Sequence, residues 1–133
     1  MLKYMLDTNI VIYTMKNRPD SVRERFKKHH GRMCISSITY MELVYGAERS
    51  SNPDRNLTSL EGFVARMDVL SLDDSAAAHA GQIRAELARL GMPIGPYDQL
   101  IAGHARSQGL VLVTNNEKEF ARVPGLRTEN WVL

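Results

Sequence analysis

Short, largely apolar segments of strand length alternate along this chain with longer segments whose apolar residues recur at helical spacing. The strand-length segments cover residues 2–6, 33–36, 69–72 and 110–113. This alternation favours an α/β domain, in which a central, mostly parallel sheet is flanked by helices. The segment 110–113 is apolar on both faces, which is typical of a central strand in such a sheet.

Capping and turn residues divide the rest of the chain into predicted helices. Thr39 and Glu42 have the spacing of a capping box, which closes the first turn of a helix. Gly91 and Gly109 stand where helices commonly end. We expect helices at about residues 8–15, 20–28, 39–48, 57–67, 74–90, 98–108 and 117–121, a loop at 50–53 and an extended tail through Trp131.

A chain of 133 residues fits one domain, so we expect a single domain over residues 1–133. The longest apolar runs, such as residues 10–13, are far shorter than the roughly 20 residues that span a bilayer. The N-terminus also lacks the layout of a signal peptide. The single cysteine, Cys34, cannot form an internal disulfide and has apolar neighbours, which predicts a buried structural thiol. We therefore expect a cytoplasmic protein without membrane contact.

Four carboxylates stand beside apolar segments or inside apolar helices. Asp7 ends the first strand, Glu42 lies within an apolar helix and Asp98 opens another. Glu119 follows shortly after the segment 110–113. A carboxylate next to buried segments costs free energy unless a metal, a hydrogen bond or a partner charge compensates it. If folding brings the four together, they repel one another and require a cation.

The predicted topology places most of these acids at one edge of the sheet. Ligands of open parallel sheets bind beyond the carboxyl ends of the strands, where Asp7 and the segment 114–116 fall. Glu42 is expected in the first turn of the helix that follows the second strand. Asp98 begins a helix that comes from the opposite end, so this helix must lean over the same edge for the acids to meet.

Magnesium is the metal that best fits a cluster of acids. It takes hard oxygen ligands, usually one or two carboxylates together with waters and substrate phosphates. Near a phosphodiester it polarises the phosphate, lowers the pKa of an attacking water and neutralises the leaving oxygen. No His/Cys cluster has zinc spacing, and we expect His79 and His104 on helix faces rather than as ligands.

Each acid also has a purely structural interpretation, which remains open. Asp7 could cap the first helix, and Glu42 could be the capping-box partner of Thr39. Asp98 could interact only with the positive end of its helix dipole, and Glu119 could be a surface acid between basic neighbours.

A basic run extends from Lys16 to Arg32. Seven Lys and Arg residues and two acids give this run a net charge of +5, whereas the whole chain carries +2, so the remainder is net negative. Such a patch could gather a polyanion such as RNA. It could equally be a solvated helix face.

Several ordered motifs resemble those of the PIN-domain ribonucleases, and among them the VapC toxins of bacterial type II toxin–antitoxin modules. The resemblance covers nearly all of the chain and implies a PIN-like α/β fold. The motifs are Met5–Asn9, Ile35–Leu43 with Tyr45–Ala47, Pro93–Ala102, Val113–Asn116 with Glu119–Phe120, and the ending Val123–Leu126 with Glu129–Trp131.

The resemblance implies an endoribonuclease that depends on Mg²⁺, with Mn²⁺ as a substitute, and whose metal is held by Asp7 and Asp98. Glu42 matches the family's third acid. Many relatives carry an aspartate where this chain has asparagines at 115 and 116, so the fourth role would pass to Glu119, with Glu117 as the alternative. The side chains expected to orient the metal waters are those of Thr8, Asn9, Thr114 and Asn116.

The resemblance also implies partners. Family members often cut tRNA in the anticodon region, and some cut initiator tRNA. They are inhibited by a small VapB antitoxin, which wraps the toxin and contacts operator DNA. They commonly form homodimers and larger toxin–antitoxin assemblies.

Two other functions are considered from the residues alone. A receiver-like signalling domain would need an acid pair after the first strand, but Asp7 has no adjacent acid. A non-catalytic module would use the acids to recognise a partner and the basic run to bind RNA or protein. A Rossmann nucleotide enzyme is disfavoured because no G-x-G-x-x-G follows the first strand.

Overall fold

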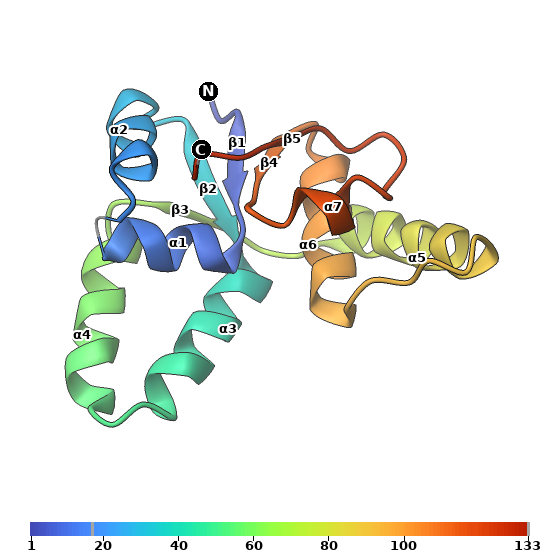
Figure 1. Ribbon diagram of the computed structural model, residues 1–133. Coiled ribbons are helices and arrows are strands. Elements are labelled where there is room, and N and C mark those ends of the chain that lie inside the picture. Colours follow the sequence, from blue (N-terminus) through green and yellow to red (C-terminus); the bar gives the residue numbers. More distant parts are fainter. Residues whose placement is uncertain (17, 133) are drawn as a thin grey trace.

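A five-stranded parallel sheet with helices on both faces forms the framework of the computed structural model, which describes residues 1–16 and 18–132 (Figure 1). The strand order is β3-β2-β1-β4-β5, and every neighbouring pair is parallel. The elements in chain order are β1 (Tyr4–Leu6), α1 (Thr8–Met15), α2 (Asp20–Lys28), β2 (Met33–Ser36), α3 (Ser37–Glu48), α4 (Pro53–Val64), β3 (Asp68–Leu70), α5 (Asp74–Arg89), α6 (Pro96–Ser107), β4 (Val111–Val113), α7 (Glu117–Phe120) and β5 (Thr128–Glu129).

Alternate residues of β1 supply two separate hydrophobic cores. Tyr4 and Leu6 pack into the core that contains residues of α1, α2 and α4. Met5 packs into the core on the other face, which contains residues of α5 and α6. Successive side chains of a strand point to opposite faces, so a strand covered by helices on both sides must be apolar throughout. This explains why the strand segments were recognisable in the sequence, and it confirms the predicted α/β class.

Several predicted boundaries differ from the structure. β1 begins at Tyr4 rather than Leu2, and β3 covers Asp68–Leu70 rather than residues 69–72. α4 begins at Pro53, which suits the first position of a helix because its missing N–H has no partner there. The strand in the middle of the sheet is β1, and β4 lies between β1 and β5. The extended tail includes β5, which pairs with β4.

The predicted capping box at the start of α3 is wrong. α3 begins at Ser37, and the hydroxyl of Ser36 caps it by accepting a hydrogen bond from the Ile38 N–H at 3.1 Å. Thr39 is buried inside the first turn, and Glu42 lies in the second turn rather than the first. Because Thr39 is not the cap, the capping interpretation of Glu42 is excluded.

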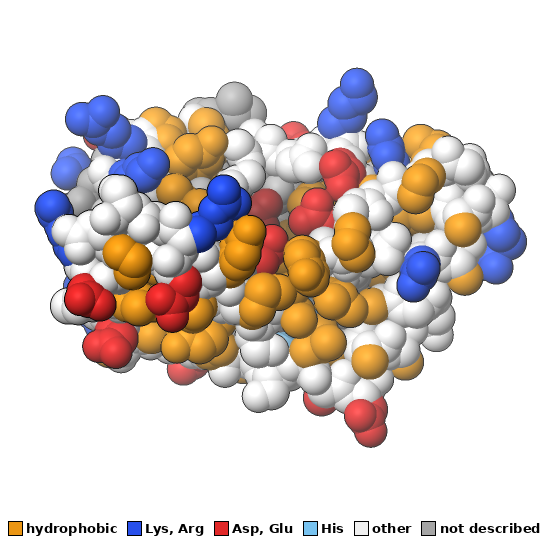
Figure 2. Space-filling model, turned by 90° about the horizontal axis from the view of Figure 1, so that it is seen from below, with side chains coloured by type: hydrophobic (Ala, Val, Ile, Leu, Met, Phe, Trp, Pro, Cys, Tyr) orange, Lys and Arg blue, Asp and Glu red, His pale blue; other side chains and the backbone are white. Residues whose placement is uncertain are grey.

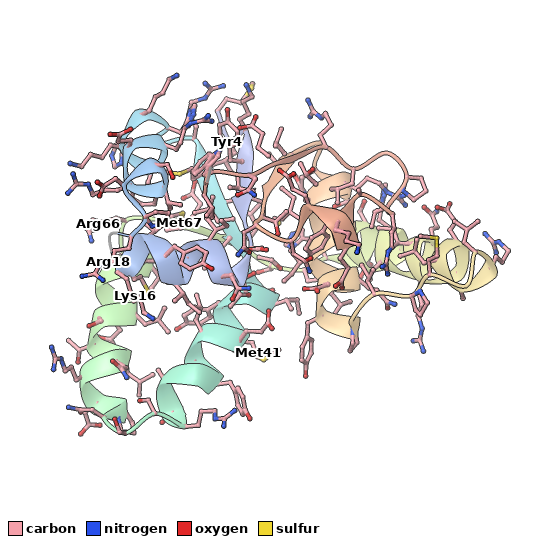
Figure 3. The ribbon with its side chains drawn as sticks, viewed as in Figure 1. Tyr4, Lys16, Arg18, Met41, Arg66 and Met67 are labelled. Carbon is pink, nitrogen blue, oxygen red and sulfur yellow. The ribbon has the colours of Figure 1, made fainter. Side chains whose placement is uncertain are left out.

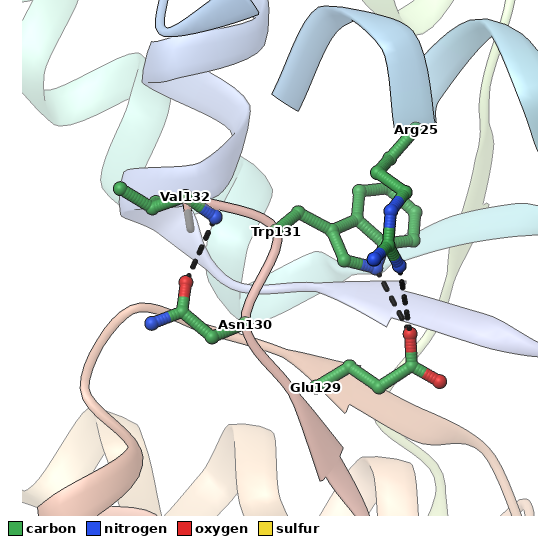
Figure 4. A network of polar contacts seen from close by, with 5 residues as sticks. All are labelled: Arg25, Glu129, Asn130, Trp131 and Val132. Atoms are coloured by element: carbon green, nitrogen blue, oxygen red, sulfur yellow. Dashed lines mark hydrogen bonds and ion pairs between the residues drawn. The ribbon is translucent and has the colours of Figure 1, made fainter. Parts of the chain in front are cut away.

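The C-terminal segment ties α2 to the sheet (Figure 4). Glu129 Oε1 accepts a hydrogen bond from Trp131 Nε1 at 3.1 Å and lies 3.7 Å from Arg25 Nη1. Trp131 is fully buried, and its ring packs against the rings of Tyr4 and His29. The tail therefore completes the core beneath α2. Among the described residues, no helix is both long enough and apolar enough to cross a membrane.

Candidate active site

Asp7 lies where β1 meets α1, at the carboxyl edge of the sheet. Its N–H donates to the Val113 carbonyl of β4, and its carboxylate caps α1 by accepting from the Ile10 N–H at 3.0 Å. The residue is only 6% exposed. Burial raises the pKa of Asp7, and a hydrogen bond with the Thr114 side chain opposes this rise. Asp7 is thus a rigidly held carboxylate with a desolvation penalty that a cation would relieve.

Glu42 joins α3 to the start of α1. Its Oε1 accepts a hydrogen bond from the Thr8 hydroxyl at 2.7 Å. The contact links residues 34 positions apart and holds the glutamate beside the segment that carries Asp7. Oε2 remains available to a ligand or a water because the hydrogen bond engages the other oxygen.

Asp98 lies in the first turn of α6, and this helix leans over the same edge of the sheet as the other acids. The pKa of Asp98 is raised to about 7, first by burial and then by the neighbouring acids Glu119, Asp7 and Glu42. The other three acids therefore lie close enough to Asp98 to act on it electrostatically. The requirement that α6 approach this edge is met.

Glu119 lies on α7, and two hydrogen-bond donors hold its carboxylate. Its Oε2 accepts from Asn116 Nδ2 at 3.0 Å, and its Oε1 accepts from the Gly95 N–H at 3.3 Å. Burial alone would raise the pKa of Glu119, but these hydrogen bonds outweigh burial and lower it. The pKa of Asp98 is thus raised and that of Glu119 lowered, so Asp98 is the more readily protonated member of this pair.

Of the residues predicted to orient metal-bound waters, some contact the acids through their side chains and one only through its backbone. Thr8 and Asn116 hydrogen-bond to acids as described, and the Thr114 hydroxyl also accepts from the Asn116 N–H at 2.9 Å. Asn9 reaches Asp7 only through its backbone N–H, while its side chain is exposed. Glu117 is exposed on α7, and its side chain makes none of the hydrogen bonds found among the described residues. Glu119 is therefore the acid that the structure brings to the cluster.

The donor set fits a hard divalent cation with an open coordination sphere. Figure 2 shows acidic side chains gathered in a hollow in the middle of one face, with hydrophobic side chains along its rim. In residues 1–16 and 18–132, no group of three or more His, Cys, Asp or Glu side chains is arranged so that it could hold a metal ion. A divalent cation at this site would therefore take one or two carboxylates and complete its shell with water and substrate oxygens.

Ser36 and His104 form a buried contact that the sequence did not predict. His104 Nδ1 lies 2.8 Å from Ser36 Oγ, and both residues are 0% exposed. The sequence placed His104 on a helix face, which is correct, but its partner lies 68 positions away. Only the position of Ser36 directly before a helix could have identified it as a candidate cap.

Two further expectations concern residues outside the acid cluster. Cys34 is buried as predicted, and burial raises the pKa of its thiol to about 12, so it is no nucleophile. Asp73, after the third strand, caps α5 by accepting from the Ala76 N–H at 2.9 Å. Asp73 therefore has a structural role as a helix cap.

The family profile described as "PIN domain" matches residues 4–126. A tRNA(fMet)-specific endonuclease VapC of Shigella flexneri is 68% identical over 131 residues, which cover 98% of this chain and 99% of that protein. A protein of the same name from Salmonella typhimurium is 64% identical over 131 residues, with the same coverage of both chains.

Solved structures match over nearly the whole chain as well. A crystal structure of DNA-bound VapBC from Salmonella typhimurium aligns with a TM-score of 0.94 and 64% identity, covering 98% of this chain and 99% of that one. The structure of VapBC2 from Rickettsia felis bound to a promoter DNA fragment aligns with a TM-score of 0.92 and 38% identity, with the same coverage.

Proposed function

This chain belongs to the PIN-domain family and, within it, to the VapC ribonucleases, and from this premise we propose that it cuts initiator tRNA with Asp7, Glu42, Asp98 and Glu119 as catalytic residues. The observation that carries the proposal is the convergence of four acids from distant parts of the chain, which is expressed in the raised pKa of Asp98. Two relatives named for cleavage of tRNA(fMet) support this choice of substrate. The cut itself would lie in the anticodon region.

Asp7 and Asp98 are the residues that would hold the metal. We assign Mg²⁺, with Mn²⁺ as a substitute, and the bound ion would polarise the scissile phosphate and neutralise charge on the leaving oxygen. Asp7 is fixed by the N-terminus of α1 and by Thr114, so it offers a ligand of constant position. The pKa of Asp98 is raised by burial and by the acids around it, so a bound cation would favour its carboxylate form.

Glu42 is the residue we assign to the attacking water. The Thr8 hydroxyl fixes one carboxylate oxygen, so the second is free to orient a water or take its proton. Glu119, held by Asn116 and Gly95, would position Asp98 and add negative charge for the cation. The remaining polar groups of Thr114 and Asn9 would orient waters around this cluster.

We further propose that a VapB-type antitoxin inhibits this protein and that operator DNA is contacted only through that antitoxin. Two matched solved structures are VapBC complexes bound to DNA, which supports a VapB-type partner and an assembly that contacts DNA. We also propose that the protein forms a homodimer within a larger toxin–antitoxin assembly. Residues 1–133 would form a single domain, and the protein would act in the cytoplasm.

Incubation with total tRNA in Mg²⁺, followed by mapping of the cut ends, tests the function. We expect one major cut in initiator tRNA, no cleavage in excess EDTA and a strong loss in Glu42→Gln. Glu48→Gln is the matched control because Glu48 is exposed on the same helix. RNA binding with no cleavage over hours would instead favour the non-catalytic module.

A further inference from the structure

The basic residues of α2 point in two different directions. Arg25 faces the C-terminal segment and pairs with Glu129 (Figure 4). Arg23 and Lys27 are four positions apart and so share a helix face. They line a hollow of about 470 Å³ between α2 and α4, to which Arg66 adds a third cation.

No carboxylate lines this hollow, and its other walls include Met15, Phe26 and Phe63. Among the described residues, the one ion pair within 4.0 Å is that of Arg25 with Glu129, so the cations of the hollow are not neutralised by an acid. Three unneutralised cations around an apolar floor form a surface suited to an anionic partner.

The hollow adjoins a second one that reaches Glu42. This second hollow of about 710 Å³ is lined by Glu42 and Lys16, and it shares Met15 and Ser59 with the first. Helix α1 spans the distance between the two regions, because Asp7 caps its start and Lys16 caps its end. At a rise of about 1.5 Å per residue, the two caps lie roughly 13–14 Å apart. In Figure 3, Lys16, Arg18 and Arg66 lie on one side of the molecule, near the ends of α1 and α4.

We propose that this basic groove, defined as Lys16, Arg23, Lys27 and Arg66, binds the sugar–phosphate backbone of the RNA substrate about one helix length from the bond that is cut. The inference rests on the proposed function. The four acids repel RNA, so the attraction must come from elsewhere, and contacts of Lys and Arg with phosphates supply most of the affinity of nucleic-acid complexes. An acidic protein segment fits less well, because a continuous path from the groove would lead it to the four acids.

Binding to initiator tRNA, measured by fluorescence anisotropy at several KCl concentrations, tests the groove directly. The measurement uses an Asp98→Asn background so that the RNA stays intact. We expect the Arg23→Ala/Lys27→Ala protein to bind about tenfold more weakly at 0.1 M salt, with the slope of log K against log[salt] reduced by about 1.4 for two lost single-strand phosphate contacts. The Arg84→Ala/Arg89→Ala protein is the matched control, since it loses the same charge from α5.

Cleavage kinetics in the otherwise native sequence give a second readout. Arg23→Ala/Lys27→Ala should raise the KM for tRNA with kcat within about twofold, because the groove lies away from the reacting phosphate. The charge-preserving Arg23→Lys/Lys27→Arg should restore most of the affinity. If the double alanine protein fails to fold, Arg66→Ala provides the same test from the end of α4.

Equal tRNA affinity of the groove variant and its α5 control would overturn the proposal. Loss of antitoxin binding with unchanged tRNA binding would also overturn it and assign the groove to the protein partner. If the native protein cuts no RNA, the proposed function fails, whereas the binding measurement still decides whether the groove holds RNA.

Discussion

Ser36 and His104 are joined by a buried contact of 2.8 Å that ties the helix bearing Glu42 to the helix bearing Asp98. Ser36 ends β2 and caps α3, and His104 lies on α6. The helices that carry Glu42 and Asp98 are thus connected inside the protein by this contact. His104 Nε2 is buried without a hydrogen-bond partner, so the contact through Nδ1 is the polar interaction that fixes this ring.

Ser36→Ala removes the helix cap and the partner of His104 together. We expect the free energy of unfolding to fall by about 2–4 kcal/mol, since a cap contributes about 1 kcal/mol and an orphaned buried polar group costs about 1–3 kcal/mol. Urea unfolding provides the measurement. Asn52→Ala is the control, because Asn52 caps α4 on the surface and should cost only about 1 kcal/mol.

The stability of the protein should depend on pH through His104. Burial lowers the pKa of His104 from 6.5, and Asp73 opposes this only in part, so the unfolded chain binds the proton more readily than the folded one. The resulting stability is present above pH 6.5 and is lost as the pH falls through the lowered value. His104→Gln should therefore lose less stability than the native protein between pH 7.5 and 5. His30→Gln, at an exposed ring, should behave as the native protein does; equal slopes for all three would contradict this assignment.

Asp98 should destabilise the metal-free protein at alkaline pH. Its pKa rises from 3.8 to about 7 on folding, mainly by burial, so this group favours the folded state below pH 3.8 and the benefit disappears as the pH rises through 7. In EDTA at pH 8, Asp98→Asn should melt at a higher temperature than the native protein, and near pH 4 the difference should shrink. Mg²⁺ should stabilise the native protein more than Asp98→Asn. A lower melting temperature of Asp98→Asn at pH 8 in EDTA would refute this expectation.

The strands that are buried on both faces could be predicted from the sequence. Strands whose conformation depends mainly on pairing with a neighbour could not. Every residue of β1, β2 and β4 is buried, and all but Ser36 are apolar, because helices cover both sides of the sheet. β5 has two residues, and its extended conformation comes from pairing with β4 rather than from a pattern of its own. β3 lies at the edge and is largely exposed, so its boundaries carried little apolar signal.

The positions of the acids were predictable to different degrees. Asp7 directly follows a predicted strand, so the topology alone placed it at the carboxyl edge of the sheet. The role of Glu42 was obscured because Thr39 had capping-box spacing while the real cap was Ser36. The anchoring of Glu119 by the Gly95 N–H joins residues 24 positions apart, and no local pattern encodes such a contact.

Gly103 sets how closely α6 approaches α5 and hence where Asp98 lies. A Cβ at Gly103 would be 2.5 Å from the Ala80 backbone nitrogen, and backbone cannot yield as a side-chain tip can. Gly103→Ala should cost about 1–3 kcal/mol of unfolding free energy and slow RNA cleavage by displacing α6. Gly81→Ala is the control, since a Cβ there meets nothing within 4 Å and alanine favours a helix by up to about 1 kcal/mol. Equal stability of the two variants would contradict a tight helix contact.

The most direct test compares the rate of initiator tRNA cleavage by the native protein, Asp98→Asn and Asp54→Asn at saturating Mg²⁺. Asp54 is an exposed aspartate in the first turn of α4, as Asp98 is in the first turn of α6, so the pair separates loss of the site from loss of a helix-dipole interaction. If Asp98 is a metal ligand as proposed, Asp98→Asn should cut at least about a hundredfold more slowly, whereas Asp54→Asn should match the native rate. Cleavage by Asp98→Asn at the native rate would contradict the assignment of the four acids as the active site.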